Sequence, residues 1–360
     1  MRTTVIFAVL LATFDQATPF LWKKTPSDIK QNPKLPTPEA PVGSRFVDLP
    51  SGDTVRYIDT HGDATDKGIS RTPTFLLIHG FGGVLETWEH LTPFLLKNND
   101  GDSRIARVVA LDLVGSGFSA KPPSFDYSYR NQGNVVSEFV SVLGLSNVVL
   151  VGHSSGTVVA AAAAAASRAN TSDTKQPPPV VATVFVASAL FHAKSRLFSV
   201  RWLKPFFSWT LVKTMGNRRK GLESMHLPSN AHRVLTDDFV EKFVAPTRLP
   251  NFYGALVETV MAKEAPYEEL FDELLAQSTT TNSIPMLFVW GKDETYKPLP
   301  EKQQASIQRK LDAIDTESEQ DQKYKVEVAR LEDCHHYAQH EQPEALANEI
   351  LGFLERNVAL

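Results

Sequence analysis

A serine between two glycines is the first residue pattern in this sequence that could carry out chemistry. Residues 152–156 read GHSSG, a G-x-S-x-G pentapeptide with Ser154 at its centre and Ser155 as a second hydroxyl. An apolar run (148–151) precedes it directly, and an alanine-rich run (157–166) follows it. A strand, a tight turn and a helix in this order form a nucleophile elbow, in which the helix N-terminus favours developing negative charge. The pattern predicts Ser154 as the nucleophile.

A glycine-rich loop earlier in the chain could serve the same reaction. Residues 79–83 read HGFGG and follow the apolar run 75–78. Acyl transfer creates an oxyanion, and its hydrogen-bond donors must already be in place. We expect the backbone N–H of Ser155 to be one donor and that of Phe81 to be the second. His79 lies in the wrong loop for a base, and we expect it to hydrogen-bond within its own loop.

A serine hydroxyl also needs a base, and the base needs a carboxylate that orients it. After an elbow nucleophile the acid comes next in the chain and the histidine last. The apolar run 286–290 is followed closely by Asp293 and Glu294, whereas the residues just after the run 181–186 offer no carboxylate. We predict Asp293 as the acid, with Glu294 as the alternative.

The candidate base lies after the last apolar run. Residues 324–331 lead into two adjacent histidines, His335 and His336. One imidazole has to face Ser154, while the other could point to solvent. The residues alone leave the choice between the two open.

These groups need a scaffold that brings distant segments together. From residue 75 on, short apolar runs alternate with helical stretches, which is typical of a doubly wound, mostly parallel sheet. We therefore predict an α/β fold, with an N-terminal hairpin at 45–47 and 55–58. The expected strands are 75–78, 108–111, 148–151, 181–186, 286–290 and 324–331, and the expected helices are 86–96, 131–143, 157–168 and 343–357.

The chain divides into an N-terminal extension, a core and an insertion. Residues 1–22 contain an apolar run of signal-peptide length, which predicts secretory, endomembrane or organelle targeting; without that role the protein would be cytoplasmic. Residues 23–43 form a proline-rich linker. We expect the α/β core at 44–189 and 284–360. The intervening stretch, 190–283, is too long for a connection and has no convincing strand, so it predicts an inserted helical cap.

Together these motifs resemble the α/β-hydrolase superfamily, in particular its serine-nucleophile branch of capped, esterase- and lipase-like enzymes. The resemblance covers about residues 46–357, with four signatures in the family's order. These are HGFGG at 79–83, DLVGSGFSAKP at 112–122, GHSSG at 152–156, and His-x4-Glu-x-Pro at His336, Glu341 and Pro343. The last spacing implies that His336 is the base, although family members usually carry glycine where this chain has His335.

The resemblance implies a serine hydrolase that cleaves an ester or related carbonyl bond through an acyl-enzyme. The aromatic- and arginine-rich stretch 194–221 of the cap favours a medium-sized, largely apolar substrate and would allow peripheral membrane contact. The alternatives are lyase or cofactor-free haloperoxidase or perhydrolase chemistry on the same triad, and a non-catalytic ligand-binding member of the fold. Epoxide hydrolases share the layout, but their elbow nucleophile is aspartate.

Composition argues against several other classes. The formal net charge is −4 and the pI about 6.2, so nothing points to nucleic acid as a partner. The sequence has no H-E-x-x-H motif and no P-loop, and we expect neither a metal site nor a cofactor. We expect Cys334, the only cysteine, to pack beside the site rather than to react. The oligomeric state stays open.

Overall fold

The computed structural model describes residues 37–62, 72–97, 106–169, 179–191, 200–215, 217–276, 283–294 and 325–358. The predicted targeting segment at 1–22 and most of the linker at 23–43 lie outside these ranges, so both stay predictions. In the part of the chain that the structure describes, every helix is too short or too polar to cross a membrane.

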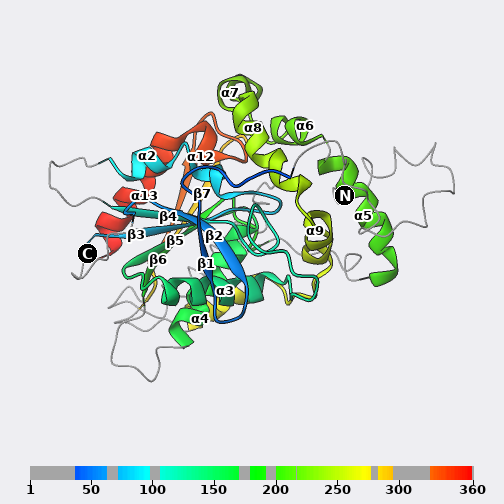
Figure 1. The fold of residues 1–360 in the computed structure, drawn as a ribbon. Coiled ribbons are helices and arrows are strands. Elements are labelled where there is room, and N and C mark those ends of the chain that lie inside the picture. The colour runs from blue at the N-terminus through cyan, green and yellow to red at the C-terminus, as the bar shows by residue number, and fades with distance from the viewer. Residues whose placement is uncertain are drawn as a thin grey trace.

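An eight-stranded sheet forms the centre of the molecule, with strand order β1-β2-β4-β3-β5-β6-β7-β8 (Figure 1). From β4 to β8 neighbouring strands in this order run parallel. The carboxyl ends of β5, β7 and β8 therefore meet at one edge, where ligands bind in folds of this kind. The strands are β1 (Arg45–Asp48), β2 (Thr54–Asp59), β3 (Thr74–Ile78), β4 (Arg107–Leu111), β5 (Val148–His153), β6 (Val180–Val186), β7 (Met286–Gly291) and β8 (Val326–Leu331). The predicted α/β fold is confirmed.

The N-terminal hairpin adds two antiparallel strands to one side of this sheet. β1 pairs with β2, and β2 pairs with β4. β2 also positions the buried guanidinium of Arg56, which lies 2.5 Å from the Glu86 carboxylate and 3.1 Å from that of Asp112. Asp112 in turn accepts the backbone N–H of Leu85 at 2.7 Å. This ionic cluster ties the hairpin to the segment that follows the HGFGG loop.

Helices cover both faces of the sheet, which is why its central strands are uniformly apolar (Figure 1). On one face α3 (Tyr129–Val142) and α4 (Gly156–Ala169) pack closely together. A Cβ on Gly133 of α3 would lie 2.4 Å from the Cβ of Ala162, so the close approach of these helices depends on that glycine. On the other face lies α13 (Pro343–Asn357), whose bounds are those predicted.

The helix predicted at 86–96 is wrong as a single helix. The structure has a 3-10 turn, η4 (Leu85–Trp88), and then one short turn of α-helix, α2 (Thr92–Leu95). Pro93 sits in the first turn of α2, where its missing N–H costs nothing. The same proline disfavours a continuous helix through the residues before it, because its ring restricts the preceding backbone.

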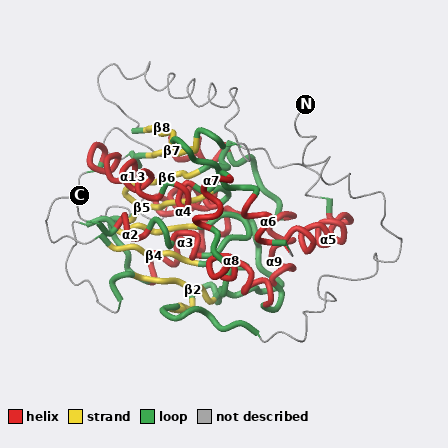
Figure 2. The backbone as a smooth tube through the Cα atoms, turned by 90° about the horizontal axis from the view of Figure 1, so that it is seen from above, coloured by secondary structure: helices red, strands yellow, loops and turns green. Residues whose placement is uncertain are grey.

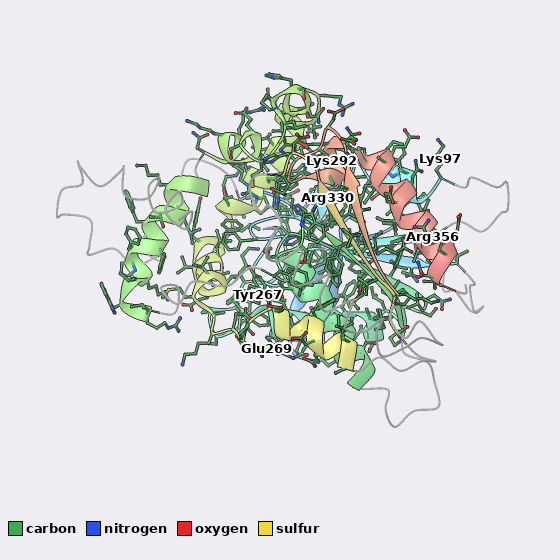
Figure 3. All side chains as sticks on the ribbon, turned by 180° about the vertical axis from the view of Figure 1, so that it is seen from behind. Lys97, Tyr267, Glu269, Lys292, Arg330 and Arg356 are labelled. Carbon is green, nitrogen blue, oxygen red and sulfur yellow. The ribbon has the colours of Figure 1, made fainter. Side chains whose placement is uncertain are left out.

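Only helices are described between β6 and β7, and most of them gather at one side of the sheet (Figure 2). They are η6 (Arg201–Leu203), α5 (Lys204–Met215), α6 (Arg218–Glu223), α7 (Pro228–Val234), α8 (Asp237–Val244), η7 (Ala245–Arg248), α9 (Phe252–Met261) and α10 (Glu268–Ala276). α10 differs from the rest because it packs on α4 and buries Phe271 in the main core (Figure 3, near Tyr267 and Glu269). We use "cap" below for residues 200–261 alone.

Candidate active site

Ser154 occupies the turn between β5 and α4, as predicted. Its φ is 53°, a left-handed conformation that is uncommon for a residue with a side chain and is the kind of backbone strain found at functional sites. The Ser154 N–H donates to Val186 O at the end of β6, and its carbonyl accepts the N–H of Thr157 at 3.2 Å. The side chain is nearly buried. Backbone bonds on both sides therefore hold this residue in its strained conformation.

The two flanking glycines are required by steric contact. A Cβ on Gly152 would lie 2.5 Å from the carbonyl oxygen of Gly156. A Cβ on Gly156 would lie 2.4 Å from His79 O, at the end of β3. Real Cβ atoms do not approach backbone oxygens this closely, so the elbow can form only with glycine at both positions.

The HGFGG loop is a tight turn against this elbow. Gly83 N–H donates to Gly80 O at 2.9 Å, and Gly82 has a φ of 62°, as at the third position of a type II turn. A Cβ on Gly80 would lie 3.0 Å from the Cβ of Ser154. The turn therefore lies directly against Ser154.

His79 stabilises this turn. Its Nδ1–H donates to Gly80 O at 2.8 Å, and its Nε2 accepts the N–H of Leu113 at 3.1 Å. Burial is the main reason that the pKa of His79 is lowered, which keeps the ring neutral and able to accept at Nε2. The prediction that His79 bonds within its own loop is confirmed.

The predicted oxyanion donors flank the elbow. The Phe81 N–H and Gly80 O belong to the same peptide group and point in opposite directions. His79 and Gly83 both donate to Gly80 O, so the Phe81 N–H is directed away from these two donors. Ser155 stands between the strained serine and the first residue of α4. Within the described residues, neither N–H takes part in a backbone hydrogen bond. Both are available to a substrate oxygen.

A buried imidazole–carboxylate pair lies beside the elbow. His336, in the loop after β8, has its Nδ1 2.6 Å from Oε2 of Glu294, in the loop after β7. The two side chains are 2% and 3% exposed. The residue before the nucleophile, His153, donates from Nε2 to His336 O at 2.9 Å, and the two rings are 4.9 Å apart. This contact places the pair next to Ser154.

The carboxylate that holds His336 belongs to Glu294, so the prediction of Asp293 as the acid is wrong. Asp293 is exposed, and its backbone N–H donates to Cys334 O at 3.0 Å. The turn after β7 is held close to the histidine loop, since a Cβ on Gly291 would lie 2.1 Å from Cys334 O. This turn directs the Asp293 side chain outward and the Glu294 side chain inward. Chain order alone could not separate two adjacent carboxylates.

The same loop separates the two histidines. His336 meets Glu294, whereas His335 donates from Nδ1 to Met225 O, in the cap, at 3.0 Å. The His336 N–H also donates to Met225 O, at 3.3 Å. Met225 therefore contacts both histidines, which shows that the cap touches the loop that carries the candidate base.

The sequence contained Glu341 in a signature but did not predict what its side chain contacts. Its carboxylate is fully buried and accepts two backbone N–H groups, that of His335 at 2.5 Å and that of Leu227 at 2.6 Å. One side chain thus joins the histidine loop to the cap. The His-x4-Glu-x-Pro signature contained this residue, but its spacing says nothing about a partner more than a hundred residues away.

A second pair of histidines extends this junction. His226, in the cap, has its Nε2 2.9 Å from Nδ1 of His340 on α12 (Ala338–Glu341). The outer nitrogens of the two rings lie 2.8 Å from Leu222 O and 2.9 Å from Thr87 O. Tyr337 stacks on both rings, at 4.8 and 4.6 Å. Burial lowers the pKa of His226 to about 4 and that of His340 well below its ordinary value.

Cys334 packs beside this site, as predicted. It is buried, and its burial raises the pKa of the thiol, so the reactive thiolate is disfavoured. Among the residues that the structure describes, no three histidine, cysteine, aspartate or glutamate side chains are arranged to hold a metal ion.

Comparison with known proteins gives a family and its relatives. The model of the alpha/beta hydrolase family matches residues 75–349. Lipase 1 of Psychrobacter immobilis is 29% identical over 279 residues, which are 71% of this chain and 70% of that protein. Lipase 3 of a Moraxella species (strain TA144) is 27% identical over 71% of each chain. Among solved structures, the epoxide hydrolase CorEH aligns with a TM-score of 0.60 and 18% identity, over 87% of this chain and 98% of that one.

Proposed function

Since the chain belongs to the alpha/beta hydrolase family, we propose that it is a serine hydrolase that cleaves an ester bond through an acyl-enzyme. The observation that carries the proposal is the buried His336–Glu294 pair in contact with the residue before Ser154. Two relatives of this chain are called lipases, which supports ester bonds as the target. The fold shared with an epoxide hydrolase does not extend to the chemistry, because this elbow holds a serine.

The pair provides the base for this reaction. The Nδ1–H of His336 is held by Glu294, which leaves the lone pair at Nε2 for the proton of Ser154. The carboxylate fixes this tautomer and stabilises the imidazolium that forms. We therefore assign the acid role to Glu294 in place of Asp293.

The first step is attack on the ester carbonyl. Ser154 Oγ forms a bond to the carbonyl carbon as its proton passes to His336, and the carbonyl oxygen becomes an oxyanion held by the N–H groups of Phe81 and Ser155. The imidazolium then gives its proton to the leaving alcohol. Water, deprotonated by His336, releases the acid and restores the serine.

We place a medium-sized, largely apolar substrate under the cap. Phe81 keeps 37% of its surface exposed beside the elbow and could line an apolar acyl site. The cap is itself packed around aromatic and aliphatic side chains, with Phe207 buried against Val257 and Met261. Trp202, 72% exposed on the cap, is the residue through which peripheral membrane contact would be made.

Labelling with a fluorophosphonate probe tests the proposal. The probe phosphonylates a serine only when a base activates it, so we expect wild-type protein to be labelled and Ser154→Ala to stay unlabelled. Ser155→Ala, which changes the neighbouring hydroxyl and keeps the Ser155 N–H position, is the control and should label like wild type. A folded wild-type protein without labelling would favour a ligand-binding role for the fold.

A further inference from the structure

A buried arginine connects the cap to the turn that carries one oxyanion donor. Arg218, the first residue of α6, is 7% exposed, and its Nη2 donates to Gly82 O. Its guanidinium also lies 5.6 Å from the ring centroid of Phe243 on α8. One cap side chain is therefore held between the cap's own core and the HGFGG turn.

Arg218 holds the end of the HGFGG turn that the turn's own hydrogen bond to Gly80 O leaves open. Gly80 O is already held by His79 and Gly83, which fixes the first peptide of the turn. Gly82 O belongs to the last peptide, and Arg218 holds it from the cap side. The Phe81 N–H, the candidate oxyanion donor, belongs to the first peptide, and Arg218 restrains it by holding the other end of the same turn. With both ends held, that N–H cannot rotate away without breaking a hydrogen bond.

The charge of Arg218 also reaches this turn. Burial is the largest cause of the lowered pKa of His79; Asp112 acts in the opposite direction, and the positive charge of Arg218 lowers the pKa further by a smaller amount. In a site shielded from water a fixed positive charge acts more strongly than it would in solvent. Because Arg218 bonds to the turn that carries the Phe81 N–H, its positive charge lies close to where negative charge develops in the proposed reaction.

We propose that Arg218 is a positioning residue of the oxyanion hole, which holds Gly82 O from the docked cap and favours the anionic intermediate over the neutral substrate. The inference rests on the serine-hydrolase proposal. It makes stabilisation of the intermediate depend on docking of the cap, which would then contribute to kcat as well as to substrate choice.

The test compares Arg218→Met with a matched control one residue away. Arg219→Met also removes an α6 arginine, but Arg219 is partly exposed and bonds to Asp237, Glu223 and Leu235 O within the cap. We expect Arg218→Met to lower kcat by about 10-fold to 100-fold with KM changed less than about 3-fold, and Arg219→Met to behave as wild type. Arg218→Lys, which keeps the charge, should recover part of the loss. Equal kcat in Arg218→Met and Arg219→Met would overturn the inference.

A second readout separates this role from a loss of packing. A trifluoromethyl ketone bonds to the nucleophilic serine, whose proton passes to the histidine, and its carbonyl oxygen becomes an oxyanion like that of the intermediate. We expect Arg218→Met to weaken this inhibitor by the same factor that it lowers kcat/KM. If Arg218→Met fails to fold, Arg218→Gln replaces it and should show about a 10-fold loss of both, because it keeps N–H donors but not the charge. Unchanged inhibitor affinity in a folded variant would contradict the proposal.

Hydrogen exchange tests the ordering of the turn without any substrate. Backbone amides in the peptide that covers residues 79–88 should exchange faster in Arg218→Met than in wild type and Arg219→Met. Equal exchange in all three would show that Arg218 does not hold the turn. This measurement needs no activity, so it tests the role of Arg218 even if the fluorophosphonate probe does not label wild-type protein. Absence of labelling would count against the hydrolase proposal alone.

Discussion

The two halves of the candidate active site are built in different ways. The nucleophile side is a short continuous segment, in which Ser154 lies between two glycines and its strained backbone is held mainly by bonds to its own turn and to β6. On the base side, His336 contacts two residues from distant parts of the chain, Glu294 after β7 and Met225 of the cap, while Glu341 holds the neighbouring His335. The nucleophile therefore depends on local geometry, and the base depends on correct tertiary packing.

The largest expected effect is on the nucleophile side. Ser154→Ala removes the hydroxyl that forms the acyl-enzyme in the proposed mechanism, so kcat for a p-nitrophenyl ester should fall about 10⁴-fold or more. Thermal unfolding should change little, because the strained turn is held by backbone bonds that alanine keeps. A variant with near wild-type turnover would refute Ser154 as nucleophile.

The next largest effect distinguishes the two carboxylates on the base side. Glu294→Gln should lower kcat about 10³-fold to 10⁴-fold, since an amide cannot fix the right tautomer or stabilise the imidazolium. Asp293→Asn, at an exposed side chain, should change kcat less than about 3-fold. The opposite pattern would return the acid role to Asp293 and show that its side chain, not that of Glu294, faces His336.

The buried His226 of the cap, in contact with His340, predicts a pH dependence of stability. The folded pKa of His226 is about 4, below the unfolded value of 6.5. Between these pH values the unfolded chain binds a proton that the folded protein does not, so stability is complete above pH 6.5 and falls as the pH drops toward 4. This one residue contributes on the order of 3 kcal/mol. Chemical denaturation at pH 7 and pH 5 measures part of this loss, because pH 5 lies above the folded pKa.

Two substitutions sharpen this pH test. His226→Gln should reduce the difference in unfolding free energy between pH 7 and pH 5, whatever its effect at pH 7. His232→Gln removes an exposed histidine of α7 and should leave the difference as it is in wild type. Equal pH dependence in all three proteins would show that His226 is not buried in the neutral form.

The smallest predicted effect concerns the carboxylate that joins cap and histidine loop. In Glu341→Gln one side-chain oxygen still accepts an N–H from His335 or Leu227, but the amide NH₂ group faces the second N–H and cannot accept it. The free energy of unfolding should fall by about 1–3 kcal/mol, the usual range for a buried polar group that loses its partner. Urea denaturation measures it, with Glu344→Gln, an exposed substitution at the start of α13, as the control. No loss of stability would mean that the cap is held at this point by other contacts.

The sequence predicted the scaffold well because its signals are local. The uninterrupted apolar runs of β3, β5 and β7 fit strands covered on both faces, and the structure confirms each of them. The helix expected at 86–96 failed for an equally local reason, since Pro93 begins a new turn rather than continuing the old one.

By itself, the sequence determined where the candidate nucleophile lies and what backbone it needs. Glycine at 152 and 156 permits the close backbone approach that the turn from β5 into α4 needs, and the G-x-S-x-G spacing puts Ser154 at the centre of that turn. Tertiary structure decided which of two adjacent carboxylates and which of two adjacent histidines face inward. In such a turn two adjacent side chains point in opposite directions. Contacts with the loop after β8 and with the cap decide which of the two faces inward.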